Sequence, residues 1–154
     1  MHVFADCEFT DFLDCDLISI ALVAADGREF YAERSDYDDA ACSAFVREAV
    51  LPQLGRWPDR VTTREGLRDA LLGWLGGFGD GGYVCVDDAT DWDLLLDALG
   101  DVPPLWQGVL VGQLVNQERR EGYFAKHGGR HHALHDARAL RASMPENLPS
   151  FETP

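Results

Sequence analysis

The stretch HVFADCEF, residues 2–9, decides the fold because it sets the first strand and the direction of its side chains. Apolar and polar residues alternate along most of it, a pattern that predicts a β-strand. Successive side chains of a strand point to opposite faces, so Asp6 and Glu8 would share one face and lie close together. The other face would carry the apolar side chains Val3, Ala5, Cys7 and Phe9.

Two further strands are predicted directly after the first. DLISIALVA at 16–24 is almost continuously apolar and rich in β-branched residues, as expected of a strand that is covered on both faces. Asp26 and Gly27 then supply a hairpin turn into REFYAER at 28–34. We therefore expect the chain to open with three antiparallel strands.

The rest of the chain alternates helical and strand patterns. Helical spacing predicts helices at about 38–54, 63–78, 91–99 and 132–143, and short apolar runs predict strands at 83–86 and 109–111. The predicted fold is therefore α/β, with a mixed five-stranded sheet in which three antiparallel strands precede parallel ones, flanked by helices. We expect one domain over 1–144 and a loose, proline-containing tail over 145–154.

The charge balance narrows the class of partner. Thirteen Lys and Arg residues stand against twenty-seven Asp and Glu residues, which gives a net charge of −14. This balance argues against a broad basic surface that grips duplex DNA or an anionic membrane. If the partner is a nucleic acid, a bound divalent cation that bridges carboxylates to phosphate would help to hold it.

The cysteines and the lack of long apolar runs indicate in which cellular compartment the protein is expected. The four cysteines form no Cys-x-x-Cys pair, so we expect reduced, mostly buried thiols rather than a zinc site or a thioredoxin-type motif. Neither a charged-then-apolar leader nor a long apolar run is present, so we expect a cytoplasmic protein without a membrane partner.

Acidic residues gather at two predicted strands. Asp6 and Glu8 offer oxygen ligands of the kind that Mg²⁺ or Mn²⁺ prefers, although an exposed strand end with solvated acids would look the same. The strand at 83–86 runs into the acids Asp87, Asp88, Asp91 and Asp93. Asp91 and Asp93 both fall in the first turn of the next helix, where an aspartate often acts as a cap. Both cannot cap one helix, which leaves one free for another role.

A histidine-rich stretch, HHALHDARAL at 131–140, begins the last predicted helix. His132 would share a helix face with Asp136, and His131 would do so only if it lies just before the helix, as the preceding Gly128-Gly129 makes plausible. His127, His131, His132 and His135 would alternatively form a transition-metal site.

In these three stretches the sequence resembles the DEDDh family of 3′-to-5′ exonucleases, which have an RNase H-like fold. The first family motif matches DCEFT with Asp6 and Glu8, the second DDATDW with Asp91, and the third HHALHD with His131 and Asp136. The opening strands and the stretch HHALHDAR also resemble a small bacterial exoribonuclease subfamily first noted in mycobacteria. Two features depart from the pattern: Asp87 stands where the family usually has Asn, and Asp88 or Asp93 would be substitutes for Asp91.

The resemblance implies a function and a set of roles. Two divalent ions, Mg²⁺ or Mn²⁺, would be held by Asp6, Glu8, Asp91 and Asp136, and His131 would be the general base. By similarity Phe9 and Thr10 would line the pocket for the 3′-terminal nucleotide, although alternation places Phe9 in the core. His132 and His135 would then have surface or supporting roles.

The implied substrate is a short single-stranded RNA or a 3′ overhang. The segment at 117–132 gathers cations and aromatic rings, so we expect either a loop that tracks phosphates or a solvated loop that balances local acids. The preference for RNA rests on the resemblance alone. A DNA exonuclease of the same fold and a non-catalytic acidic protein-binding module are the alternatives, and a homodimer through an apolar patch with Trp57 or Trp106 is a further expectation.

Overall fold

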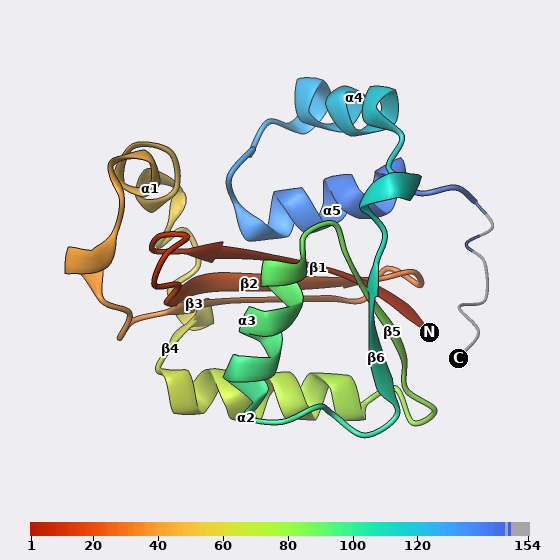
Figure 1. The fold of residues 1–154 in the computed structure, drawn as a ribbon, viewed down its shortest axis with the longest axis horizontal. Coiled ribbons are helices and arrows are strands. Elements are labelled where there is room, and N and C mark those ends of the chain that lie inside the picture. Colours follow the sequence, from red (N-terminus) through yellow and green to blue (C-terminus); the bar gives the residue numbers. More distant parts are fainter. Residues whose placement is uncertain (147, 149–154) are drawn as a thin grey trace.

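The computed structural model describes residues 1–146 and 148, and a six-stranded sheet forms its centre (Figure 1). Across the sheet the strands are β4 (Val61–Thr62), β3 (Glu29–Arg34), β2 (Leu17–Ala24), β1 (His2–Phe9), β5 (Gly82–Val86) and β6 (Trp106–Leu110). β1, β2 and β3 are antiparallel neighbours, whereas β5 runs parallel to β1 and β6 runs parallel to β5. This mixed α/β architecture confirms the predicted fold class and is consistent with an RNase H-like fold.

The strand β4 was not predicted from the sequence. Its two residues pair in parallel with Glu33 and Arg34 at the edge of the sheet. Because two residues show no periodicity, no sequence pattern could have indicated this strand.

Helices cover both faces of the sheet, with α5 and α4 on one side and α2 and α3 on the other (Figure 1). Their bounds are α1 (Ala44–Ala49), α2 (Arg64–Gly76), α3 (Ala89–Leu99), α4 (Gln117–His127) and α5 (Ala133–Ser143). The largest core cluster packs the apolar face of β1 against α2 and α3, through Leu67, Leu71 and Leu95 among others. On the other face, Ala133, Leu134 and Ala137 of α5 pack on β2 and β3.

The prediction of one continuous helix over 38–54 is wrong. The segment consists of a 3₁₀ turn at Asp39–Ala41, the six-residue α1, and a second 3₁₀ turn at Leu51–Gln53. Ser43 begins α1 as its cap, because its hydroxyl accepts a hydrogen bond from the Val46 amide at 3.2 Å.

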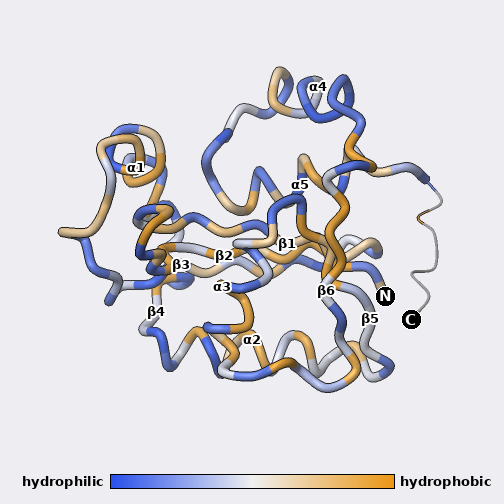
Figure 2. Tube along the Cα trace, in the orientation of Figure 1, coloured by the Kyte–Doolittle hydropathy of each residue, from blue (hydrophilic) through white to orange (hydrophobic). Residues whose placement is uncertain are grey.

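The prediction of a loop over 117–132 is also wrong for most of its length, because Gln117–His127 form the helix α4. Asn116 caps this helix by accepting a hydrogen bond from the Arg119 amide at 3.0 Å. In Figure 2 the tube of α4 is largely hydrophilic, and Phe124 is its one buried residue. A helix that buries a single residue has few apolar positions, so the apolar pattern that indicates a helix is weak in its sequence.

The two tryptophans considered for an exposed patch differ. Trp106 is 5% exposed and packs edge-on against Phe78, so it belongs to the core rather than to a surface patch. Trp57 is 38% exposed and lies against the rings of Tyr31 and His132.

Two further expectations concern membranes and the tail. Within 1–146, the continuous part that the structure describes, every helix is too short and too polar to cross a membrane. Residues 147 and 149–154 of the expected tail lie outside the described residues.

Candidate functional site

The β1 strand presents two carboxylates to the α5 side of the sheet. Val3, Ala5 and Cys7 face the core under α2 and α3, so Asp6 and Glu8 project from the opposite face, as the alternation predicted. Both carboxylates line a cleft of about 730 Å³. The first strand therefore supplies two acids to one wall of this cleft.

Asp91 reaches the same cleft from the first turn of α3. It is 5% exposed, and its Oδ1 accepts a hydrogen bond of 3.0 Å from the backbone amide of Cys7, which fixes the start of α3 to β1. Asp88 instead caps α3 by accepting a hydrogen bond from the Thr90 amide at 2.8 Å, and Asp93 is exposed. Of the three acids left open by the sequence, the structure brings Asp91 beside Asp6.

Asp136 enters the cleft from the first turn of α5. Its Oδ2 accepts a hydrogen bond of 3.0 Å from the backbone amide of His132, which lies at the helix start. A carboxylate in this position is also favoured by the helix dipole.

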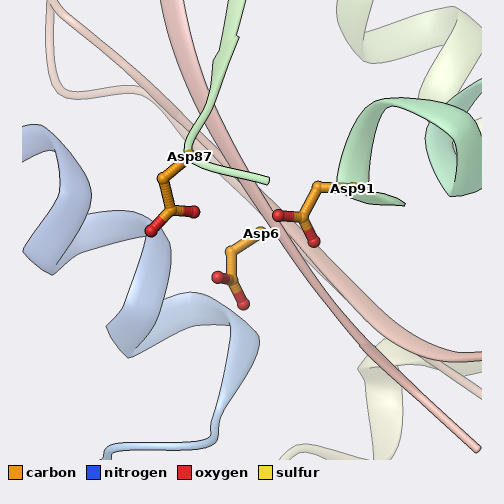
Figure 3. Close-up of side chains that lie close together, drawn as sticks. All are labelled: Asp6, Asp87 and Asp91. Atoms are coloured by element: carbon orange, nitrogen blue, oxygen red, sulfur yellow. The ribbon is translucent and has the colours of Figure 1, made fainter. Parts of the chain in front are cut away.

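The carboxylates form two groups that share Asp6. Ligand oxygens of Asp6, Glu8 and Asp136 lie within 4.8 Å of one another, and so do those of Asp6, Asp87 and Asp91 (Figure 3). Figure 3 shows one oxygen of Asp87 directed toward the other two residues. Each group thus has the spacing needed to surround one cation.

The electrostatics of these groups favour a bound cation. Burial, together with repulsion from Asp91, holds the pKa of Asp6 well above its ordinary value. Burial first and neighbouring carboxylates second raise the pKa of Glu8 to about 8 and that of Asp91 to about 7. Burial also raises the pKa of Asp136 to about 6. The four carboxylates are crowded, with Asp91 and Asp136 buried and Asp6 and Glu8 partly buried. They offer oxygen ligands only and have little positive charge beside them, which fits a divalent cation such as Mg²⁺ or Mn²⁺.

Asp87 and Arg120 were missed as site residues. They form an ion pair of 2.6 Å between the end of β5 and α4, and each side chain is about one-fifth exposed. Asp87 had been noted as a departure from a family pattern, whereas nothing in the sequence singled out Arg120 from the other cations of its segment. Such a pairing across 33 residues depends on how α4 folds back over the sheet.

His131 lies at the edge of the same cleft. It lies just before α5, which is the position that the sequence required for His131 to face Asp136. Its ring meets the ring of Phe45 edge-on, with 4.9 Å between the ring centroids. Burial, helped by the charge of Arg130, lowers the pKa of His131 below 6.5. The imidazole is therefore neutral near pH 7 and able to accept a proton.

The other histidines lie elsewhere. His132 is 1% exposed and stacks on Tyr31 at 4.9 Å, and burial lowers its pKa to about 4. His135 contacts the Tyr123 hydroxyl through Nδ1 at 3.1 Å. Among the described residues, the groups with the spacing for a metal ion consist of carboxylates, so the transition-metal alternative has no geometric support.

The two residues expected to hold a nucleotide differ in position. Phe9 lines the cleft and packs edge-on against the exposed Phe12, next to a register shift in the pairing of β1 with β2. Thr10 is fully buried, and its hydroxyl accepts from the Asp16 amide and donates to the Asp14 carbonyl. The structure therefore does not bring the Thr10 side chain to the cleft.

The cations of the 117–132 segment are largely engaged with the protein itself. Arg119 donates to the Met144 carbonyl at 3.1 Å, and Arg120 pairs with Asp87. Arg130 pairs with Glu121 at 2.8 Å and lies over the Phe124 ring. These bonds do not support the expected role of the segment as a free cationic loop.

The fold and site together define a mixed α/β protein with a carboxylate-rich cleft beside a neutral histidine. No family model matches the chain. Over 55 residues it is 46% identical to two curated proteins from Mycobacterium tuberculosis, strains CDC 1551 and H37Rv, each named as a 3′-5′ exoribonuclease. The match spans 35% of this chain and about a third of each relative.

Proposed function

We propose that the protein is a metal-dependent 3′-to-5′ exoribonuclease of the DEDDh kind. The observation that carries the proposal is that Asp6 joins two carboxylate groups in one cleft, with the neutral His131 at its edge. The names of the two mycobacterial relatives, which match over part of the chain, add support for the reaction and for RNA as substrate.

The acids would hold two divalent cations, Mg²⁺ or Mn²⁺. Asp6 would be shared, with Glu8 and Asp136 on one side and Asp91 on the other. When bound, the cations supply Lewis acidity and the positive charge that lets a phosphodiester enter an acidic cleft. The protein's part is to fix the carboxylates, through the Cys7 amide on Asp91 and the His132 amide on Asp136.

His131 would act as the general base. It would take a proton from the water that attacks the terminal phosphorus, while the bond from phosphorus to the 3′ oxygen of the preceding nucleotide breaks. That leaving oxygen takes a proton from solvent, and the products are a nucleoside 5′-monophosphate and a strand shorter by one nucleotide. The lowered pKa of His131 keeps the base available at neutral pH.

The cleft fits a single strand better than a duplex. Its apolar wall is formed by Phe9, Phe12, Phe45 and Val46. Phe12 is 78% exposed and Phe45 is 55% exposed, so both rings are accessible to unstacked bases. A net charge of −14 would repel a long duplex, whereas a strand end would be held by the cations.

The test compares matched RNA and DNA oligonucleotides in Mg²⁺ or Mn²⁺. We expect faster degradation of RNA, and a loss of at least about a hundredfold in Asp6→Asn and His131→Ala variants, because a positioned general base contributes about 10²–10⁴-fold. Faster degradation of DNA would favour the DNA exonuclease. No degradation of either strand would favour the non-catalytic module.

A further inference from the structure

The backbone of His131 has an unusual conformation. Its φ is +65°, a left-handed value that is uncommon outside glycine, although histidine adopts it more often than most other residues. Such strain persists where surrounding contacts hold the residue in place, and it is often found at functional sites. The contacts that hold His131 are therefore of interest for the position of its ring.

The peptide group between His131 and His132 is held at both ends. Its carbonyl, on His131, accepts a hydrogen bond of 3.1 Å from Nε2 of Gln53. Its N–H, on His132, donates to Oδ2 of Asp136 at 3.0 Å. The preceding carbonyl, on Arg130, also accepts from Nε2 of Gln53, at 2.8 Å. One glutamine amide thus contacts two successive carbonyls of the strained turn.

Gln53 is itself anchored. Its Nε2 also lies 2.9 Å from the Ala49 carbonyl at the end of α1, so three carbonyls share the two hydrogens of one amide. The same segment carries Phe45, whose ring meets the ring of His131. α1 and the 3₁₀ turn after it therefore contact both the backbone and the side chain of His131.

We propose that Gln53 is a positioning residue for His131. This inference rests on the proposed function, in which His131 is the general base. Gln53 holds the turn in its left-handed conformation, and the turn aims the imidazole into the cleft. Without the amide donor, the carbonyls of Arg130 and His131 lose their hydrogen bonds to Gln53. The His131 backbone then relaxes, which moves the ring. A small displacement of a catalytic group can cost about 10²-fold in rate.

The experiment replaces the amide by groups of similar length. Gln53→Met removes the donor, and Gln53→Glu puts an acceptor in its place, opposite the carbonyls. Gln107→Met, at an exposed position of β6, is the matched control. We expect both Gln53 variants to lower kcat on single-stranded RNA about 10- to 100-fold. KM should stay within about twofold, because the cleft walls are unchanged.

A double-mutant cycle separates positioning from a general structural effect. If Gln53 acts through His131, Gln53→Met has no further effect on the residual rate of His131→Ala. Circular dichroism and thermal unfolding of each variant show that the fold is kept.

The outcomes distinguish the two proposals. If the unaltered protein degrades RNA and His131→Ala does not, while both folded Gln53 variants keep full kcat, Gln53 is not a positioning residue and the proposed function stands. An equal further loss in the His131→Ala background would also overturn the inference. If the unaltered protein degrades no RNA, the proposed function fails, and the inference fails with it.

Discussion

Asp6 is the residue on which the two carboxylate groups depend. It lies near the middle of β1, and its pairing with Ala21 of β2 leaves its side chain free to face the cleft. Glu8 and Asp136 approach it on one side, and Asp87 and Asp91 on the other. A change at Asp6 would therefore disturb both proposed cation positions at once.

Of the acids Asp88, Asp91 and Asp93, which follow β5, we expect only Asp91 to be needed for activity. Asp91→Asn removes a buried carboxylate from the cleft, and we expect at least about a hundredfold loss of RNA degradation. Asp93→Asn changes an exposed side chain, and Asp88→Asn keeps a residue that caps helices well, so both should retain activity within about threefold. The rates of the three variants on one RNA oligonucleotide show which carboxylate is needed. An inactive Asp93→Asn variant together with an active Asp91→Asn variant would refute the assignment of Asp91 as the functional acid.

The pH dependence of kcat should reflect the protonation of His131. Burial and Arg130 lower its pKa, so the imidazole stays unprotonated, and active as a base, down to pH values below 6.5. We expect the acid limb of the kcat profile below pH 6.5, and a residual rate in His131→Ala without that limb. A limb that persists unchanged in the variant would assign the ionisation to another group.

Some of these residues could be predicted and others could not. Asp6 and Glu8 follow from strand alternation, which is a local property of the sequence. Asp91 and Asp136 were singled out by the resemblance of their motifs to those of an exonuclease family, because position in a first helical turn equally fits a cap. Arg120 and Phe45 reach the cleft, and Gln53 reaches the His131 backbone, from segments 33 or more residues away from their partners. Their roles depend on tertiary packing that no local pattern records.

At the scale of elements, the start of α1 forms part of the cleft wall, and the 3₁₀ turn after α1 contacts the His131 backbone. The sequence pattern predicted a helix here but not its interruption, since Ser43 and Pro52 act through caps and turns rather than through periodicity. The interruption shortens α1 to Ala44–Ala49, with Phe45 near its start and Gln53 in the turn that follows it.

Phe45 should contribute to binding of the strand. We expect Phe45→Ala to raise KM for single-stranded RNA about tenfold, because stacking of one base on an aromatic ring contributes about 1–3 kcal/mol. The ring is 55% exposed, so the free energy of unfolding should change little. Leu72→Ala, at a 42% exposed position on α2, is the control, and an unchanged KM in Phe45→Ala would exclude this ring from the binding surface.

At the scale of the whole molecule, acidic charge is the dominant property. The net charge is −14, and the cleft adds buried carboxylates that repel one another. The same composition that argued against a basic binding surface supports the proposal that cations bind in the cleft.

The stability of the metal-free protein should depend on pH. The raised pKa values of Asp136, Asp91 and Glu8, about 6, 7 and 8, mean that the folded state binds more protons than the unfolded state above about pH 4. Their contribution to stability is present below about pH 4 and is lost as pH rises to about 8. Below pH 6.5 the lowered pKa of His132, about 4, acts in the opposite sense, so we expect Tm in EDTA to fall between pH 6.5 and 8. Mg²⁺ or Mn²⁺ should restore it most at pH 8, because a ligand that binds the folded state stabilises it. A Tm unaffected by the cations at pH 8 would argue against the metal site.

The most direct measurement follows a 5′-labelled linear single-stranded RNA, and a circular RNA of the same sequence with an internal label, in Mg²⁺ and in EDTA. The account predicts a ladder that shortens one nucleotide at a time from the 3′ end of the linear strand, release of nucleoside 5′-monophosphates, no loss of the circle, and no reaction in EDTA. Cleavage of the circle, or shortening that continues in EDTA, would contradict a metal-dependent 3′-to-5′ exoribonuclease.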